Sequence, residues 1–146
     1  MISKEEMEDI VKFVLRNFNC DRKFKFFFED LSPEEHFEKV KEVLDISERD
    51  DRFEQEHGTK YKDTEKFKAG CYCEVVLKDG KTPHFVICIH PKIFSKRPVW
   101  VQRRDMIHEA RHIVEYPHIS TDKESRNIDI MLLREYTKKE RLAEHS

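Results

Sequence analysis

The fold is decided by the stretch Asp105-Met-Ile-His108-Glu109-Ala-Arg-His112-Ile-Val-Glu115-Tyr116. Its pattern predicts one helix, on which His108 and His112 share a face because residues four apart lie one above the other. The opposite face is expected to pack, with Trp100 at its margin and the apolar residues Val99, Met106, Ile107, Ala110, Ile113 and Val114 along it. The stretch therefore has the form of an amphipathic helix with one packed face and one polar face.

The polar face carries the pattern His-Glu-x-x-His. The imidazoles of His108 and His112 are spaced to bind one Zn²⁺ ion, and Glu109 can take a proton from a metal-bound water. The alternative is a pair of surface histidines on an ordinary helix, because so short a motif also occurs by chance. The division of the helix into two faces favours a zinc site, with one Zn²⁺ per chain.

The composition narrows the class of protein. A length of 146 residues suits a single domain, 1–146, with a sizeable core. The 28 Lys and Arg residues nearly cancel the 30 Asp and Glu residues, and a net charge of -2 indicates neither nucleic acid nor a membrane surface as a partner. No signal peptide or membrane-spanning run is evident, so we expect a cytoplasmic protein. The oligomeric state is not indicated.

Three further helices are predicted outward from the motif. Ser3 and Glu6 form a capping box that opens the first, and Ser32-Pro33-Glu34-Glu35 opens the second, which runs to about Ile46. Thr121-Asp-Lys-Glu124 opens the last helix. The first helix is expected to bury Met7, Ile10, Val11, Val14, Leu15 and Phe18. The last is expected to bury Ile128, Met131, Leu132 and Tyr136.

Strands are predicted where β-branched and aromatic residues gather. They cover Lys23–Phe28, Cys71–Leu77 and His84–His90, the last two forming a hairpin around Asp79-Gly80. Residues 47–70 show no sustained hydrophobic period and are expected to form a long exposed segment. Three or more strands in a small mixed sheet packed with helices make the fold class α+β.

Cysteines fall on both strands of the predicted hairpin. A two-residue turn would place Cys71 directly opposite Cys88. The first interpretation is that these are small apolar side chains under the sheet. The alternatives are a cross-strand disulfide and a structural zinc site built from Cys71, Cys73, Cys88 and His90.

A catalytic zinc site normally has three protein ligands, so one must follow the motif. Glu124 is expected on the same side of the last helix as Ile128 and Met131, pointing inward, where a buried carboxylate needs a cation. It also completes the capping box that Thr121 begins, a role that needs no metal.

His118 is the alternative third ligand. The spacing from His108 to His118 is that of the metzincins, in which a third His binds after a sharp turn. Glu115 stands where that pattern has Gly, and a glutamate adopts the positive φ of such a turn only with strain.

The C-terminal part of the chain resembles a known group of peptidases. His108-Glu-Ala-Arg-His112 is followed by Lys123-Glu124-Ser-Arg-Asn-Ile128, with Met131-Leu-Leu133 beyond. Over residues 71–136 this is similar to the minimal gluzincin-type zincins, the ImmA/IrrE type and the small minigluzincins, whose ligand helix carries Glu-Ala-Asn-x-Phe. The resemblance implies a zincin-like active-site helix followed by a ligand helix, with Glu124 as metal ligand and Glu109 as general base and acid. Some gluzincins carry an Asp four residues after the ligand Glu, whereas Asp129 stands five residues after Glu124.

We therefore expect a zinc-dependent metallopeptidase that hydrolyses a peptide or protein substrate through a metal-activated water. A latent form, with the protein's own terminus or residues 47–70 in the cleft, is an alternative state. Glu109 is expected to move the proton, and Tyr116, His118 or Tyr136 to hydrogen-bond the developing oxyanion. The alternatives are a non-catalytic zinc-containing regulatory or binding module, and a metzincin-like peptidase that uses His118 as third ligand.

Overall fold

The computed structural model describes residues 1–28, 70–78, 82–117 and 123–144, with positions 30, 35, 38, 39 and 42. Its helices and its mixed sheet confirm the predicted α+β class. The chain divides into two compact units, Met1–Arg22 with Arg97–Ser146 and, separately, Lys23–Lys96. The single domain over 1–146 stays a prediction.

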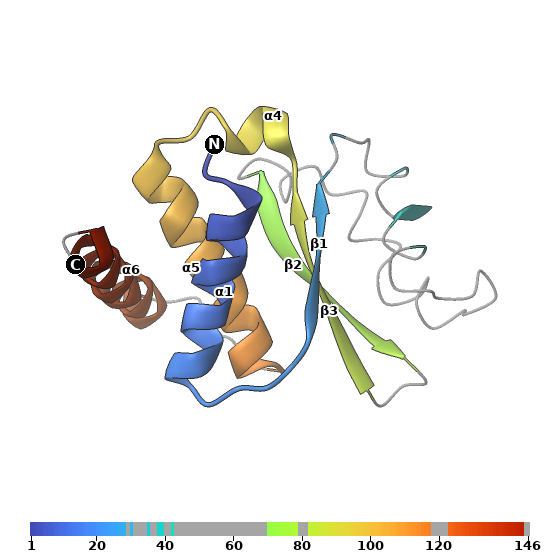
Figure 1. Cartoon of the computed structure of the whole chain (residues 1–146). Helices are drawn as coiled ribbons and strands as arrows, with labels where there is room; N and C mark the ends of the chain where they lie inside the picture. The colour runs from blue at the N-terminus through green and yellow to red at the C-terminus, as the bar shows by residue number, and fades with distance from the viewer. Residues whose placement is uncertain are drawn as a thin grey trace. The chain divides into compact units, whose positions relative to one another are not determined.

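The first unit begins with helix α1, Lys4–Asn17 (Figure 1). The predicted cap is confirmed, since the Ser3 hydroxyl accepts a hydrogen bond of 3.0 Å from the Glu6 amide. Beyond the helix, Asn19 takes the left-handed conformation, with φ 52°, as expected where the chain leaves a helix. The buried face is the predicted one apart from Phe18, which is 45% exposed. Its residues are Met7, Ile10, Val11, Val14 and Leu15.

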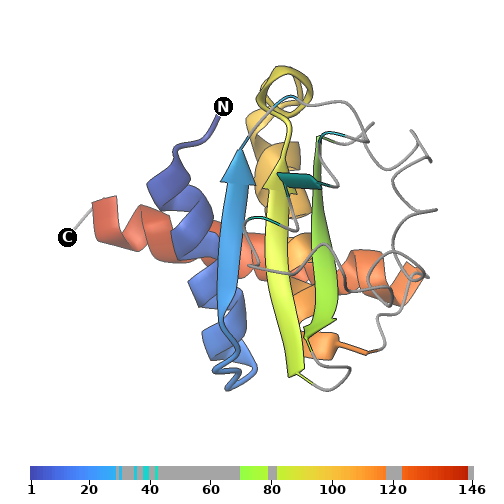
Figure 2. The same ribbon diagram turned by 90° about the vertical axis from the view of Figure 1, so that its right-hand side faces the viewer.

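Helices α5, Val99–Glu115, and α6, Lys123–Glu144, complete this unit. Helix α5 contacts both α1 and α6, and Figures 1 and 2 show α6 running across α5 instead of along it. The expected packed face of α5 is only partly correct, because Val99 is about half exposed and Val114 is only half-buried. Trp100, expected at the margin of this face, is also about half exposed. Polar residues are buried on the same helix, namely Gln102, Glu109 and Arg111.

The C-terminal end of α5 is closed by a residue far away in the sequence. The guanidinium of Arg22 donates to the backbone oxygens of Ile113, at 2.7 Å, and Tyr116, at 3.2 Å. The last carbonyls of a helix have no partner within the helix, so Arg22 provides one. This contact holds the end of the motif helix in place.

The second unit is built on a three-stranded sheet with the order β1-β3-β2 (Figure 2). Strand β1 is Phe24–Phe28, β2 is Cys71–Lys78 and β3 is Thr82–Ile89, followed by the short helix α4, Pro91–Phe94. Central β3 pairs in parallel with β1 and antiparallel with β2. The sheet is therefore mixed, as predicted.

The predicted register of the hairpin is wrong by one residue. Cys71 pairs with Ile89, and Tyr72 pairs with Cys88. The pairing of Lys78 with Thr82 shows that three residues connect the strands, not two. A shift of one residue turns every side chain to the other face of the sheet. Cys71 and Cys88 consequently lie on opposite faces, and both are free thiols.

Several expectations fall outside the described residues. These are most of the predicted helix up to Ile46, the segment 47–69, the turn Asp79-Gly80, and residues 118–122 with His118 and Thr121. Among the helices that are described, none has the length and apolarity required to cross a bilayer.

Candidate metal centre

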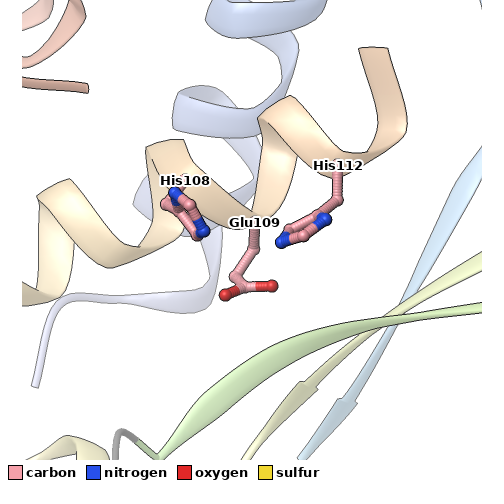
Figure 3. Close-up of side chains that lie close together, drawn as sticks. All are labelled: His108, Glu109 and His112. Atoms are coloured by element: carbon pink, nitrogen blue, oxygen red, sulfur yellow. The ribbon is translucent and has the colours of Figure 1, made fainter. Parts of the chain in front are cut away.

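The motif residues of α5 form one cluster. His108, Glu109 and His112 each offer a ligand atom, and these atoms lie within 4.8 Å of one another. Figure 3 shows the three side chains leaving the helix on one side, with the Glu109 carboxylate between the two rings. The centroids of the His108 and His112 rings are 5.0 Å apart, and the ring planes meet at an angle of 89°. The structure thus brings together the three motif residues, and the group can hold a metal ion.

Asp129 on α6 orients the first histidine. Its Oδ2 lies 2.9 Å from Nδ1 of His108, and the two side chains are 7% and 32% exposed. A carboxylate at this distance makes Nδ1 the protonated nitrogen of a neutral ring and leaves Nε2 as the ligand atom. The hydrogen bond to Asp129 raises the pKa of His108, although burial opposes the rise. A buried carboxylate therefore sets the tautomer of His108.

Asp129 is itself held by Arg111, the motif residue between Glu109 and His112. The fully buried Arg111 donates through Nη1 to Asp129 Oδ1 at 2.9 Å and to the backbone and hydroxyl oxygens of Ser125 at 2.7 and 2.8 Å. Its Nη2 donates to Glu115 at 3.0 Å. Charge-assisted hydrogen bonds of this kind are directional, so the guanidinium fixes both the Asp129 carboxylate and the first turns of α6 against α5.

Among the described residues, no carboxylate forms a hydrogen bond with His112. Burial, followed by the nearby charges of His108 and Arg111, lowers its pKa to about 4. The ring is consequently neutral near pH 7, which is the form that binds a metal. Two imidazoles and a carboxylate are ligand types that Zn²⁺ accepts, and the donor set fits this ion.

Glu124 lies outside the cluster. Its side chain is exposed, and Met131, expected on the same buried face, is 61% exposed. The expectation that Glu124 points inward is therefore wrong. The buried stripe of α6 consists instead of Ser125, Asp129, Leu132 and Tyr136. The role of Glu124 as a metal ligand stays a prediction.

The stripe is displaced because Arg111 draws Ser125 and Asp129 toward α5. Sequence reasoning missed Arg111 as part of the site, and it noted Asp129 only as standing one position later than the aspartate of some gluzincins. One signal could have identified Asp129. It lies four residues after Ser125 and three before Leu132, so it belongs to a stripe with helical spacing that a carboxylate would not occupy without a partner.

Two of the three candidate oxyanion donors, Tyr116 and Tyr136, lie in the described part of the chain, and both contact groups other than the cluster. The Tyr136 hydroxyl donates to Glu140 at 2.7 Å, one turn further along α6, and this bond with burial raises its pKa. Tyr116 directly follows α5, half buried, with its ring 5.8 Å from the guanidinium carbon of Arg22. His118 lies outside the described residues.

Comparisons with known proteins give no match to a protein-family model, a curated protein or a solved structure. The geometry of the cluster and its supporting residues is therefore the basis for a function.

Proposed function

We propose that the chain is a zinc-dependent metallopeptidase of the minimal gluzincin type that hydrolyses peptide bonds. The observation that carries the proposal is the cluster of His108, Glu109 and His112, with His108 oriented through Asp129. An ordinary surface pair of histidines would need no buried carboxylate to set a tautomer. Bound Zn²⁺ would polarise the scissile carbonyl and lower the pKa of a water molecule toward neutrality.

Each residue has a distinct role in this proposal. His108 and His112 hold the ion through neutral ring nitrogens, and Glu124 is the proposed third ligand, with His118 as its alternative. Glu109 is only 8% exposed and stands between the two rings, where its carboxylate can accept a proton from the attacking water. It then delivers the proton to the leaving amine. Tyr116 is proposed to donate a hydrogen bond to the developing oxyanion.

The proposed setting is the cytoplasm. Free thiols persist in a reducing compartment, and the four cysteines of the chain are free. The proposed substrate is a peptide or a protein. Neither nucleic acid nor a membrane is required by the chemistry of the cluster.

The substitution Glu109→Gln tests the reaction. It preserves the size of the side chain but removes its ability to take a proton, so cleavage should fall by about 10²–10⁴-fold while zinc content stays near one ion per chain. Zinc would be measured by elemental analysis of untagged protein, and cleavage by mass spectrometry of a peptide mixture. His108→Ala and His112→Ala are the controls that should lose zinc. Wild-type protein that ignores added zinc would contradict the proposal.

The second candidate is a non-catalytic zinc-binding regulatory module. It is favoured by the position of Glu109, whose carboxylate lies within 4.8 Å of the histidine ligand atoms and could bind the ion directly. A ligand carboxylate could not also act as the base. In that case Glu109→Gln would release zinc, and wild-type protein would bind zinc without cleaving any peptide.

A further inference from the structure

A pocket of about 540 Å³ opens between α5 and α6, beside the metal cluster. Its wall includes Arg104, Asp105 and His108 from α5, and Arg126, Asp129 and Ile130 from α6. His108 belongs to both the pocket and the cluster, whereas Glu109 and His112 do not line it. The pocket therefore lies on the Asp129 side of His108. Its volume is in the range of sites that bind ligands.

Both carboxylates in the wall already have cationic partners. Asp129 binds Arg111 through one oxygen and His108 through the other, each at 2.9 Å. Asp105 is 3.1 Å from Arg97 and 3.3 Å from Arg104. Neither carboxylate is therefore available to attract a cationic ligand.

The arginines of the wall are less fully engaged. Arg126 is exposed in the first turn of α6 and has no acidic partner within the described part of the chain. The Arg104 side chain is 33% exposed, and its guanidinium carbon lies 5.3 Å from the centre of the Trp100 ring. Among the described residues, its one acidic partner is Asp105, which it contacts through Nη2. A guanidinium has five N–H donors, so both arginines retain donors for a carboxylate.

Charges around the pocket leave a positive excess. Among the described residues, the wall and the side chains bonded directly to it contain four arginines, Arg97, Arg104, Arg111 and Arg126, against two carboxylates, Asp105 and Asp129. A third carboxylate, Glu115, is bonded to Arg111 and not to the wall. Glu124 stands two residues before Arg126, about 200° round the helix, and is not part of the wall. The half-buried Ile130, one turn after Arg126, adds an apolar surface.

We propose that this pocket is a substrate subsite that selects an acidic side chain, Asp or Glu, close to the scissile peptide bond. Ile130 contacts the methylene groups of that side chain, and Arg126, assisted by Arg104, binds its carboxylate. The His108 ring separates the pocket from the proposed metal position, so a substrate with its scissile carbonyl at the metal would place a neighbouring side chain in the pocket by passing the edge of this ring. The assignment rests on the proposed peptidase function, and it names the class of substrate.

The experiment uses a charge reversal that spares the metal cluster. Arg126 is exposed, so Arg126→Glu should fold normally, and circular dichroism would verify this. Arg134→Glu is the matched control, since Arg134 is an exposed arginine on the same helix that does not line the pocket. The cleavage profile of zinc-loaded protein on a peptide mixture should show Asp or Glu enriched about tenfold at one position beside the cut. Arg126→Glu should replace this preference with Lys or Arg, and Arg134→Glu should leave it unchanged.

Direct binding separates the subsite from the reaction. Three fluorescent alanine peptides that carry Glu, Gln or Lys at the centre would be titrated into Glu109→Gln protein, with and without zinc. About tenfold tighter binding of the Glu peptide, reversed by Arg126→Glu, supports the subsite. Equal binding of the three peptides, or an equal change in Arg134→Glu, overturns it. Acid-selective binding without cleavage by zinc-loaded wild-type protein would support the pocket and overturn the proposed peptidase.

Discussion

The two contacts that helix α5 makes within its own unit differ in kind. Toward α1, the contact includes the fully buried side chains Ile10 and Ile107. One turn before each of them stand Glu6 and Arg103, which form an ion pair of 2.9 Å and are 18% and 26% exposed, respectively. Toward α6, the buried part of the contact is the ion pair of Arg111 and Asp129, which are 0% and 7% exposed, and a longer, partly exposed pair joins Arg103 to Glu140 at 3.7 Å. One helix is thus held by apolar packing on one side and by a buried ionic network on the other.

This difference separates stability from positioning. Apolar burial is non-directional and stabilises in proportion to area. A buried ion pair contributes little net stability, because desolvation offsets the attraction between its charges, but it demands a defined geometry. The network lies where geometry matters, because Asp129 sets the orientation of His108. We infer that α1 stabilises the motif helix and that the α6 contact aligns its metal ligand.

Breaking the ionic contact should have the largest effect. Arg111→Met leaves the Asp129 carboxylate buried without its guanidinium, which should lower the free energy of unfolding by about 3–5 kcal/mol. Zinc affinity should fall by about 10–100-fold, because His108 loses its oriented partner. Chemical denaturation and competition with a zinc chelator would measure the two quantities.

The matched control for this variant is Arg103→Met on the same helix. Its ion pairs, with Glu6 of α1 and at 3.7 Å with Glu140 of α6, are partly exposed and do not touch Asp129, so the loss of stability should be about 1 kcal/mol, with zinc affinity unchanged. Equal effects of the two substitutions on zinc affinity would refute a positioning role for Arg111.

Breaking the apolar contact should reduce stability alone. Ile10→Ala removes a fully buried side chain and should cost about 2–5 kcal/mol. The metal cluster does not include α1, so zinc affinity measured under native conditions should stay within about twofold of wild type. A parallel fall in zinc affinity would show that α1 also positions the ligands.

A substitution at the start of α6 tests whether Glu124 on this helix is the third metal ligand. Glu124→Gln should weaken zinc binding on the order of 100-fold, or about 2.7 kcal/mol, if this carboxylate is the third ligand. Glutamine can still serve in a capping box, so the helix start is preserved. His118→Ala should leave zinc affinity nearly unchanged, and the reverse result would identify a metzincin-like site.

The smallest expected effect concerns pH and the two histidines. The pKa of His112 is lowered to about 4 in the folded chain, so its contribution to stability is complete above pH 6.5 and is lost as pH falls toward 4. The pKa of His108 is raised, so its contribution is present below 6.5 and disappears only as pH rises through the raised value. Metal-free protein should therefore lose about 1–2 kcal/mol between pH 6.5 and 5.

Denaturant titrations of metal-free protein at several pH values would measure this loss. His112→Gln should flatten the dependence over that window, whereas His108→Gln should not. A steeper loss in His112→Gln would show that another group controls it.

Local patterns in the sequence were sufficient for helices α1, α5 and α6, for the three strands and for the motif cluster, but they did not predict the short helix α4. The Ser3 cap, the buried face of α1 and the helix that carries His108, Glu109 and His112 were predictable because hydrogen bonds and side-chain spacing within a few residues determine them. The α+β class followed because strand and helix patterns differ in period.

Tertiary structure decided the features that depend on distant partners. The three-residue connection of the hairpin places Cys71 opposite Ile89, and this shift reverses the face on which every β2 side chain lies. Asp129 was predictable as a helical residue but not as the partner of His108, because its burial depends on the charge of Arg111 on another helix. Spacing along the chain can specify one face of a helix, whereas the cost of burying a carboxylate is settled only by the cation that lies next to it in space.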